Sequence, residues 1–301
     1  MPLTQKDLGR RPEWLKVKLP SGGNYQTVQG WMQGHGLHTV CEEARCPNLG
    51  ECWNNRTATF MILGSVCTRH CGFCAVQSGR PTELDLLEPE RVAKVVEQME
   101  LRHIVVTSVA RDDLVDGGAG IFADTIRAIR RHRPECSVEV LIPDFQGDWD
   151  ALRLVMDAKP EILSHNVETV ERLSDHVRSK AKYRRSLELL RQAKLQEPTS
   201  FTKSGMMLGL GEDRAEIRRT LEDLRHVGVD IVTVGQYLRP TMHHLPLERY
   251  YTPAEFADIR DEALALGFAH CESGPLVRSS YHAHEQIPAG RTPAMPAVTT
   301  P

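Results

Sequence analysis

The chain has 301 residues, of which 41% are hydrophobic and 26% are charged, an ordinary composition for a globular protein. Its formal net charge of −3 provides no basic field for nucleic acid, and its apolar runs are far shorter than a membrane span. We therefore predict that it binds neither nucleic acid nor membranes. This length suits two modest domains or one α/β barrel-type domain with extensions.

The amino terminus lacks the apolar core of a signal peptide and contains acids and prolines that are atypical of a transit peptide, which predicts a cytoplasmic protein. In a reducing compartment, the eight cysteines are expected to be metal ligands or reactive thiols rather than disulfides. Six of them lie between residues 41 and 74. Cys136 and Cys271 stand alone, and we expect both to be buried as small hydrophobic residues.

The first part of the chain shows no alternation of strands and helices. Residues 10–25, RRPEWLKVKLPSGGNY, are basic and rich in turn formers. Residues 41–52, CEEARCPNLGEC, contain Cys41, Cys46 and Cys52, separated by four and then five residues. Three thiols without a fourth predict either a zinc or disulfide staple or, beside a second such loop, an iron–sulfur cluster.

From residue 57 onward, short apolar runs alternate with segments of helical period, which predicts parallel strands joined by right-handed helical crossovers. The expected strands are residues 59–64, 103–109, 137–143, 161–168, 202–211 and 230–238. The expected helices are residues 89–101, 120–132, 148–158, 183–194, 214–228 and 252–267. Six such units form either an open doubly wound sheet or an incomplete barrel, and in both the reactive groups lie on loops at the carboxyl ends of strands.

The loop after the first expected strand, residues 67–74, reads CTRHCGFC. A structural zinc site takes four tetrahedral ligands, and the adjacent His70 and Cys71 are poorly placed to bind one small ion together. Three thiolates suit a cubane iron–sulfur cluster instead, and they leave one iron open. An open iron suits the amino and carboxylate groups of S-adenosylmethionine, whose reductive cleavage would release a 5′-deoxyadenosyl radical.

This cysteine spacing, with Phe73 before the last cysteine, resembles the signature of the radical S-adenosylmethionine superfamily. Its combination with CX4CX5C resembles the lipoyl synthase family. The family resemblance extends from about residue 10 to 284 and includes RRPEWLKVKLP, FMILGSVCTRHCGFCAV, VVTSVARDDLVDGGA, LSHNVET, MMLGLGE, TVGQYLRP and GPLVRSSYHA.

The resemblance implies a partial (β/α)6 barrel of the TIM type in residues 57–270. An N-terminal extension (residues 1–56) and a C-terminal segment (residues 271–301) would both cover the barrel mouth. The end of the C-terminal segment is rich in Pro, Ala and Thr, which predicts disorder there.

The resemblance also implies two [4Fe–4S] clusters with different tasks. The cluster that binds S-adenosylmethionine would be held by Cys67, Cys71 and Cys74. The auxiliary cluster would be held by Cys41, Cys46, Cys52 and the oxygen of Ser279 in RSSY, with Ser280 as the alternative. An oxygen donor is harder than a thiolate and poorly matched to a soft iron–sulfide site, so this iron would be labile. The resemblance implies that the auxiliary cluster would be consumed as the sulfur source.

In the implied reaction, two deoxyadenosyl radicals abstract hydrogens from C6 and C8 of an octanoyl chain on a carrier lysine, and each carbon radical attacks a sulfide. The implied partners are octanoylated lipoyl carrier domains of 2-oxoacid dehydrogenases and the glycine cleavage H protein. The resemblance also implies two further partners. These are a low-potential electron donor, such as flavodoxin or ferredoxin, and an iron–sulfur cluster carrier.

Two alternatives compete with this interpretation. A biotin-synthase-like enzyme would insert sulfur into a free small molecule, but it would not need the N-terminal cysteine triplet. A non-enzymatic iron–sulfur carrier would not need six strand–helix units.

Further residues receive weaker assignments. Phe73 is expected to help bind the cofactor. Asn166 and Glu168 follow the fourth expected strand, where they would contact the ribose or amino group of S-adenosylmethionine. Arg185 would pair with its carboxylate, because a guanidinium fork suits that geometry; a solvated helix charge is the equal alternative. A basic strip that would dock an acidic carrier domain consists of Lys6, Arg10, Arg11, Lys16 and Lys18.

Overall fold

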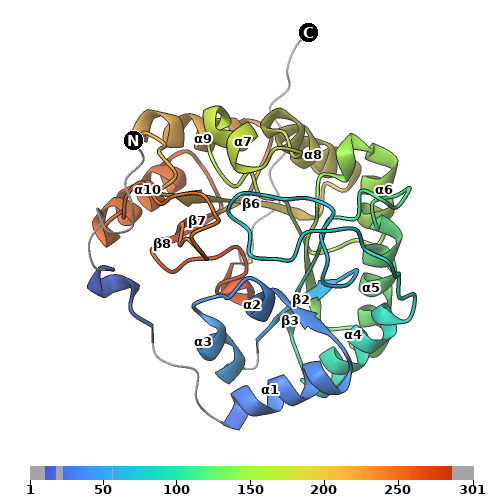
Figure 1. Cartoon of the computed structure of the whole chain (residues 1–301). Helices are drawn as coiled ribbons and strands as arrows, with labels where there is room; N and C mark the ends of the chain where they lie inside the picture. The colour runs from blue at the N-terminus through green and yellow to red at the C-terminus, as the bar shows by residue number, and fades with distance from the viewer. Residues whose placement is uncertain (1–10, 18–22, 56, 287–301) are drawn as a thin grey trace.

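One curved sheet surrounded by helices makes up the computed structural model, which describes residues 11–17, 23–55 and 57–286 (Figure 1). The eight strands follow one another across the sheet in chain order, β1 to β8. β1 pairs antiparallel with β2, and all neighbouring pairs from β2 to β8 are parallel. Within the described residues no pairing joins β8 to β1, so the barrel is incomplete. The predicted fold class, a partial TIM-type barrel, is confirmed.

The strands are short, and their bounds are β1 His38–Thr39, β2 Thr59–Ile62, β3 His103–Ser108, β4 Ser137–Leu141, β5 Ile162–Ser164, β6 Phe201–Leu208, β7 Ile231–Gln236 and β8 His270–Gly274. The barrel helices are α4 Glu88–Gln98, α5 Ala119–His132, α6 Trp149–Asp157, α7 Glu171–Val177, α8 Tyr183–Gln196, α9 Arg214–His226 and α10 Pro253–Ala265. Three N-terminal helices, α1 Gly23–Gly34, α2 Val40–Glu43 and α3 Leu49–Asn54, lie where the ring of outer helices is open (Figure 1).

Local signals explain where the barrel helices begin. Asp213 caps α9 by accepting the backbone N–H of Glu216, whose carboxylate accepts the N–H of Asp213 in return. Thr252 and Glu255 form the same capping box at α10, which also has a proline in its first turn. These reciprocal bonds satisfy N–H groups that the helix itself leaves without acceptors.

Six predicted strands and six predicted helices are confirmed, as β2 to β7 and as α4, α5, α6, α8, α9 and α10. The strand β8, which extends from His270 to Gly274, was not among the expected strands. β8 reads HCESG and has no apolar run, so it depends on pairing with β7. Cys136 and Cys271 are 2% and 5% exposed, as predicted. None of the described helices is long and apolar enough to cross a membrane.

The two ends of the described chain meet beside the barrel. The Asn48 amide, before α3, donates a 2.7 Å hydrogen bond to the carbonyl oxygen of Leu276. The Tyr281 hydroxyl donates to the Glu51 carboxylate at 3.2 Å. The C-terminal segment therefore folds back onto the N-terminal cysteine region. The tail from residue 287 onward lies outside the described residues.

Candidate active site

A cavity of about 570 Å³ opens at the carboxyl ends of the barrel strands. Inward-facing residues of successive strands line its wall, because alternate residues of a strand point to the same side. These residues are Thr59, Met61, Thr107, Leu141, Gly205, Met207, Thr233 and Gly235. Two positions deeper than Gly205, Lys203 forms a fully buried ion pair with Glu139, with 2.8 Å between Nζ and Oε1. The strands thus form the wall, and the loops at their ends carry the chemistry.

Cys67 and Cys74 of the CTRHCGFC loop line this cavity together with Phe73. The sulfur of Cys67 accepts the backbone N–H groups of Arg69 at 3.4 Å and Ala110 at 3.3 Å. Burial raises the pKa of Cys71 to about 12 and that of Cys74 to about 11, and neighbouring thiols add to both shifts. Such thiols ionise readily only when a positive metal centre binds them, so this donor set fits an iron cluster.

A buried cation anchors the CTRHCGFC loop to the barrel. The Arg69 guanidinium lies 2.7 Å from the Asp112 carboxylate and 2.6 Å from that of Asp144. Burial alone would raise the pKa of Asp144, but the Arg69 charge, the nearby His165 and the hydrogen bonds from Arg69 and Gln146 together hold the pKa below its usual value. Arg185 joins the same group, with its Nη1 atom 3.0 Å from Asp144. The structure therefore gives Arg185 a carboxylate partner within the chain, and Arg185 does not line the cavity.

Asn166 and Glu168 follow β5, and both line the cavity as predicted. The Asn166 amide donates to Glu168 at 3.1 Å, whereas its buried Oδ1 atom has no hydrogen-bond partner among the described residues. Arg178, which the sequence did not single out, donates from Nη1 to the Asn166 carbonyl oxygen at 2.9 Å. An unsatisfied buried oxygen facing a cavity indicates a ligand with a hydrogen-bond donor.

The absence of a side chain at Gly205 leaves space for the side chain of Asn166. A Cβ atom at Gly205 would lie 2.6 Å from the Thr233 hydroxyl and 2.9 Å from the Asn166 Oδ1 atom. Glu168 also bridges to β6, since its N–H donates to the Gly205 carbonyl oxygen at 3.0 Å. Asn166 and Glu168 are thus positioned by the backbone of the neighbouring strand.

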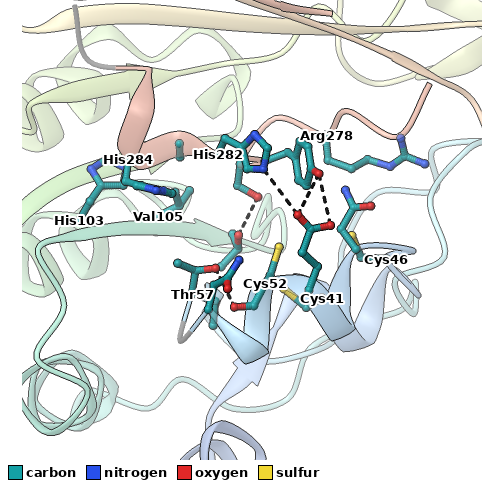
Figure 2. A pocket seen from close by; sticks show the side chains of 17 residues that line it. Cys41, Cys46, Cys52, Thr57, His103, Val105, Arg278, His282 and His284 are labelled. Carbon is teal, nitrogen blue, oxygen red and sulfur yellow. Dashed lines mark hydrogen bonds and ion pairs between the residues drawn. The ribbon is translucent and has the colours of Figure 1, made fainter. Parts of the chain in front are cut away.

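The N-terminal cysteine triplet lines a second, smaller cavity of about 70 Å³, which Figure 2 shows. Cys41, Cys46 and Cys52 all face it, and the first two also line the large cavity. Burial and the neighbouring thiols raise the pKa of Cys41 to about 11 and that of Cys52 to about 12. Two cysteines of each triplet therefore line the large cavity.

The two candidate serines differ in their surroundings. The Ser280 hydroxyl oxygen accepts a 2.7 Å hydrogen bond from the Thr59 hydroxyl, and Ser280 lines both cavities. Ser279 lines the large cavity with Cys41 and Cys46, and among the described residues its side chain has no hydrogen bond. Of the two serine side chains, only that of Ser280 therefore has a hydrogen bond within the described residues.

A single metal ion does not account for these residues. No group of three or more His, Cys, Asp or Glu side chains within the described ranges is arranged to hold one ion. All eight cysteines are free thiols. The thiolates that hold a cubane cluster need not converge on one point, because each thiolate binds a different iron. Both triplets thus fit a cluster better than a lone ion.

Two family models match the chain. The radical SAM superfamily matches residues 61–224, and the N-terminal domain of lipoyl synthase of the radical SAM family matches residues 1–46. Lipoyl synthase of Symbiobacterium thermophilum is 67% identical over 93% of this chain and 88% of its own length. Lipoyl synthase of Rubrobacter xylanophilus is 64% identical over 95% and 89%.

Solved structures with the same fold are much more distant in sequence. Methylornithine synthase (PylB) superposes with a TM-score of 0.53 at 15% identity, over 90% of this chain and 82% of that chain. Streptococcus suis SuiB bound to S-adenosylmethionine superposes with a TM-score of 0.51 at 11% identity, over 82% and 54%. At these identities the similarity concerns the incomplete barrel alone.

Proposed function

The chain belongs to the lipoyl synthase family of the radical S-adenosylmethionine superfamily, and we propose that its large cavity brings together two four-iron clusters, S-adenosylmethionine and an octanoyl chain. The enzyme is a sulfurtransferase that makes the lipoyl group. The single observation that carries the proposal is that two cysteines of each triplet, Cys41 and Cys46 and then Cys67 and Cys74, line the same cavity, which Asn166 and Glu168 also line. A radical formed at one cluster would thus reach a chain next to the other.

In this proposal, Cys67, Cys71 and Cys74 hold the cluster that cleaves S-adenosylmethionine. When bound, the cofactors supply the deoxyadenosyl radical and the sulfur. The protein supplies position: Arg69 fixes the loop through Asp112 and Asp144. Asn166 and Glu168 accept donors from the cofactor, because one buried oxygen of Asn166 has no partner among the described residues. Phe73 lines the same wall.

The auxiliary cluster is proposed to bind to the second triplet, Cys41, Cys46 and Cys52, and to Ser279. The Thr59 bond to Ser280 supports Ser279 over its neighbour. Replacing Ser279 with Ala should stop sulfur insertion while 5′-deoxyadenosine still forms, and replacing Ser280 with Ala should be milder. Full product formation by Ser279→Ala would refute serine ligation at this position.

The octanoyl chain is proposed to occupy the apolar part of the cavity wall, lined by Val40, Met61, Val76, Val109, Met206 and Leu238. The substrates proposed are octanoylated lipoyl domains of 2-oxoacid dehydrogenases and the glycine cleavage H protein. A flavodoxin or ferredoxin would reduce the first cluster, and a cluster carrier would rebuild the second. Free thiols at all eight cysteines support a cytoplasmic setting.

We propose the same division of the chain as the sequence suggests, with a barrel between two cluster-covering extensions of residues 1–56 and 271–301. The test of the whole proposal is anaerobic iron and sulfide analysis coupled to turnover with an octanoyl-lysine peptide. About eight irons per chain are expected from two cubanes. A fully active preparation that holds only four would refute it.

A further inference from the structure

Arg278 lies between the two cavities. It lines the small cavity with the N-terminal cysteines, and it also lines the large cavity with Ser279. Figure 2 shows its side chain at the end of the small cavity where Cys46 lies. A cation thus lies at the junction between the predicted cluster ligands and the reaction space.

The guanidinium of Arg278 has few partners. Its only hydrogen bond among the described residues runs from Nη1 to the carbonyl oxygen of Val277, at 2.7 Å. No carboxylate in the described ranges forms an ion pair with it, whereas the buried Arg69 pairs with both Asp112 and Asp144. A guanidinium has five N–H donors, so most of those on Arg278 remain available to an occupant of the cavities.

Partial burial makes this arrangement unfavourable for the protein alone. Arg278 is half-buried, and it lies with Cys46 on the wall of both cavities. A desolvated cation without a paired anion destabilises a fold, and a bound anion relieves that penalty. The site therefore matches an anionic group beside Cys46.

We propose that Arg278 is the counter-cation of the auxiliary cluster and stabilises that cluster in its bound form. This inference rests on the proposed function. Three thiolates and one serine oxygen carry more negative charge than a [4Fe–4S] core carries positive charge, so the assembled cluster is an anion. Arg278 precedes the proposed ligand Ser279 in the chain and lies beside the proposed ligand Cys46. Its charge would therefore act on the part of the cluster that these two ligands hold.

The test uses the full chain with Cys67, Cys71 and Cys74 replaced by Ala, so that only auxiliary iron is counted. In this background Arg278→Met removes the charge and keeps a long side chain, and Arg278→Lys keeps the charge. Arg239→Met is the matched control, because Arg239 also lines the large cavity but donates to the carbonyl oxygens of Met242 and His244.

Four measurements are made on each variant: iron and sulfide content, the rate of iron loss to a chelator, the reduction potential, and the melting temperature of the cluster-free chain. Arg278→Met should lose iron about tenfold faster and show a more negative potential, because a nearby cation favours the more reduced, more anionic cluster. Arg278→Lys should retain most of the parental behaviour, and Arg239→Met should match the parent. The cluster-free Arg278→Met chain should melt no lower than its parent.

Parental iron retention in Arg278→Met would overturn this inference alone. A lower melting temperature of the cluster-free Arg278→Met chain would also overturn it, since it would assign Arg278 a purely structural role. Weaker binding of S-adenosylmethionine by Arg278→Met in the chain that keeps Cys67, Cys71 and Cys74, with unchanged auxiliary iron in the test background, would overturn the inference and make the cofactor carboxylate the anion instead. A parent background without auxiliary iron would overturn the proposed function as well.

Discussion

At Gly235 in β7, the backbone of the C-terminal segment lies directly against the sheet. A Cβ atom there would lie 2.1 Å from the Val277 carbonyl oxygen and 3.1 Å from its carbon, and real Cβ atoms almost never approach a neighbour closer than 3.0 Å. Because both atoms belong to the backbone, Gly235→Ala must push Val277 away by roughly 1 Å. Arg278 and Ser279 follow directly, so they would move relative to Cys46.

A displacement of about 1 Å at a reacting centre lowers a rate by about a hundredfold, and we expect that loss in sulfur insertion by Gly235→Ala. Overpacking of this kind costs about 1–3 kcal/mol of stability, which urea unfolding of the variant would measure. The CTRHCGFC loop is anchored elsewhere, through Arg69, Asp112 and Asp144, so 5′-deoxyadenosine should still form near the parental rate. The assay therefore counts both products in the same reaction, with an octanoyl-lysine peptide as substrate.

Two other glycines serve as controls. Gly205→Ala would place its Cβ 2.9 Å from Asn166 Oδ1, so it should slow 5′-deoxyadenosine formation itself. Gly274→Ala meets only the Val277 Cγ2 atom at 3.3 Å, a side-chain contact that can yield, so it should be mild. Parental sulfur insertion by Gly235→Ala, in a chain that folds, would refute the proposed role of the C-terminal segment.

Three more expectations follow from the same structure. Cys71→Ala should abolish 5′-deoxyadenosine formation, whereas Cys52→Ala should stop only sulfur transfer; equal loss of cleavage in both would contradict the division of labour. Burial, and then the nearby Arg178 charge, lower the pKa of His165 to about 4, so the folded state keeps it neutral and its contribution to stability is lost as pH falls below about 6.5. Urea unfolding of the cluster-free chain should show about 2 kcal/mol less stability from this group at pH 5 than at pH 7, and His165→Gln should reduce that loss. Arg11→Gln, in a residue that lines the large cavity, should raise KM a few-fold for a whole carrier domain but not for an octanoyl-lysine peptide. Arg127→Gln, which removes an exposed ion pair with Asp124 on α5, is the control, and equal effects of Arg11→Gln on both substrates would remove the docking role.

Features with a local cause were predictable from the sequence. The strands β2 to β7 contain short apolar runs, most of the predicted helices have an apolar stripe, and α6, α9 and α10 begin at capping residues, so each pattern can be recognised within its own window. The cysteine triplets are local as well, because their chemistry depends on spacing within one loop. The docking role of the basic strip remains a prediction. Three of its residues, Lys6, Arg10 and Lys18, lie outside the described residues.

Features that depend on distant contacts were not predictable. The helix α1 contains three glycines and little apolar periodicity, and it is held by packing against α3. The position of Arg185 also escaped sequence reasoning, because its partner Asp144 lies 41 residues away in the chain. Arg178 and its bond to the Asn166 carbonyl gave no motif signal. Each of these depends on which segments the barrel brings together.

The choice between Ser279 and Ser280 shows why such contacts decide function. Two identical adjacent residues cannot be told apart by sequence. In the structure, however, the hydroxyl of Thr59 at the start of β2 donates a hydrogen bond to that of Ser280. Gly235 sets how closely their segment approaches β7, and the Asn48 bond to Leu276 fixes it from the other side. The proposed radical-forming ligands therefore depend on barrel loops, whereas the proposed sulfur-donating ligands depend on contacts between the two chain ends. A substitution can accordingly be assigned to one half-reaction by which of these two sets of contacts it disturbs.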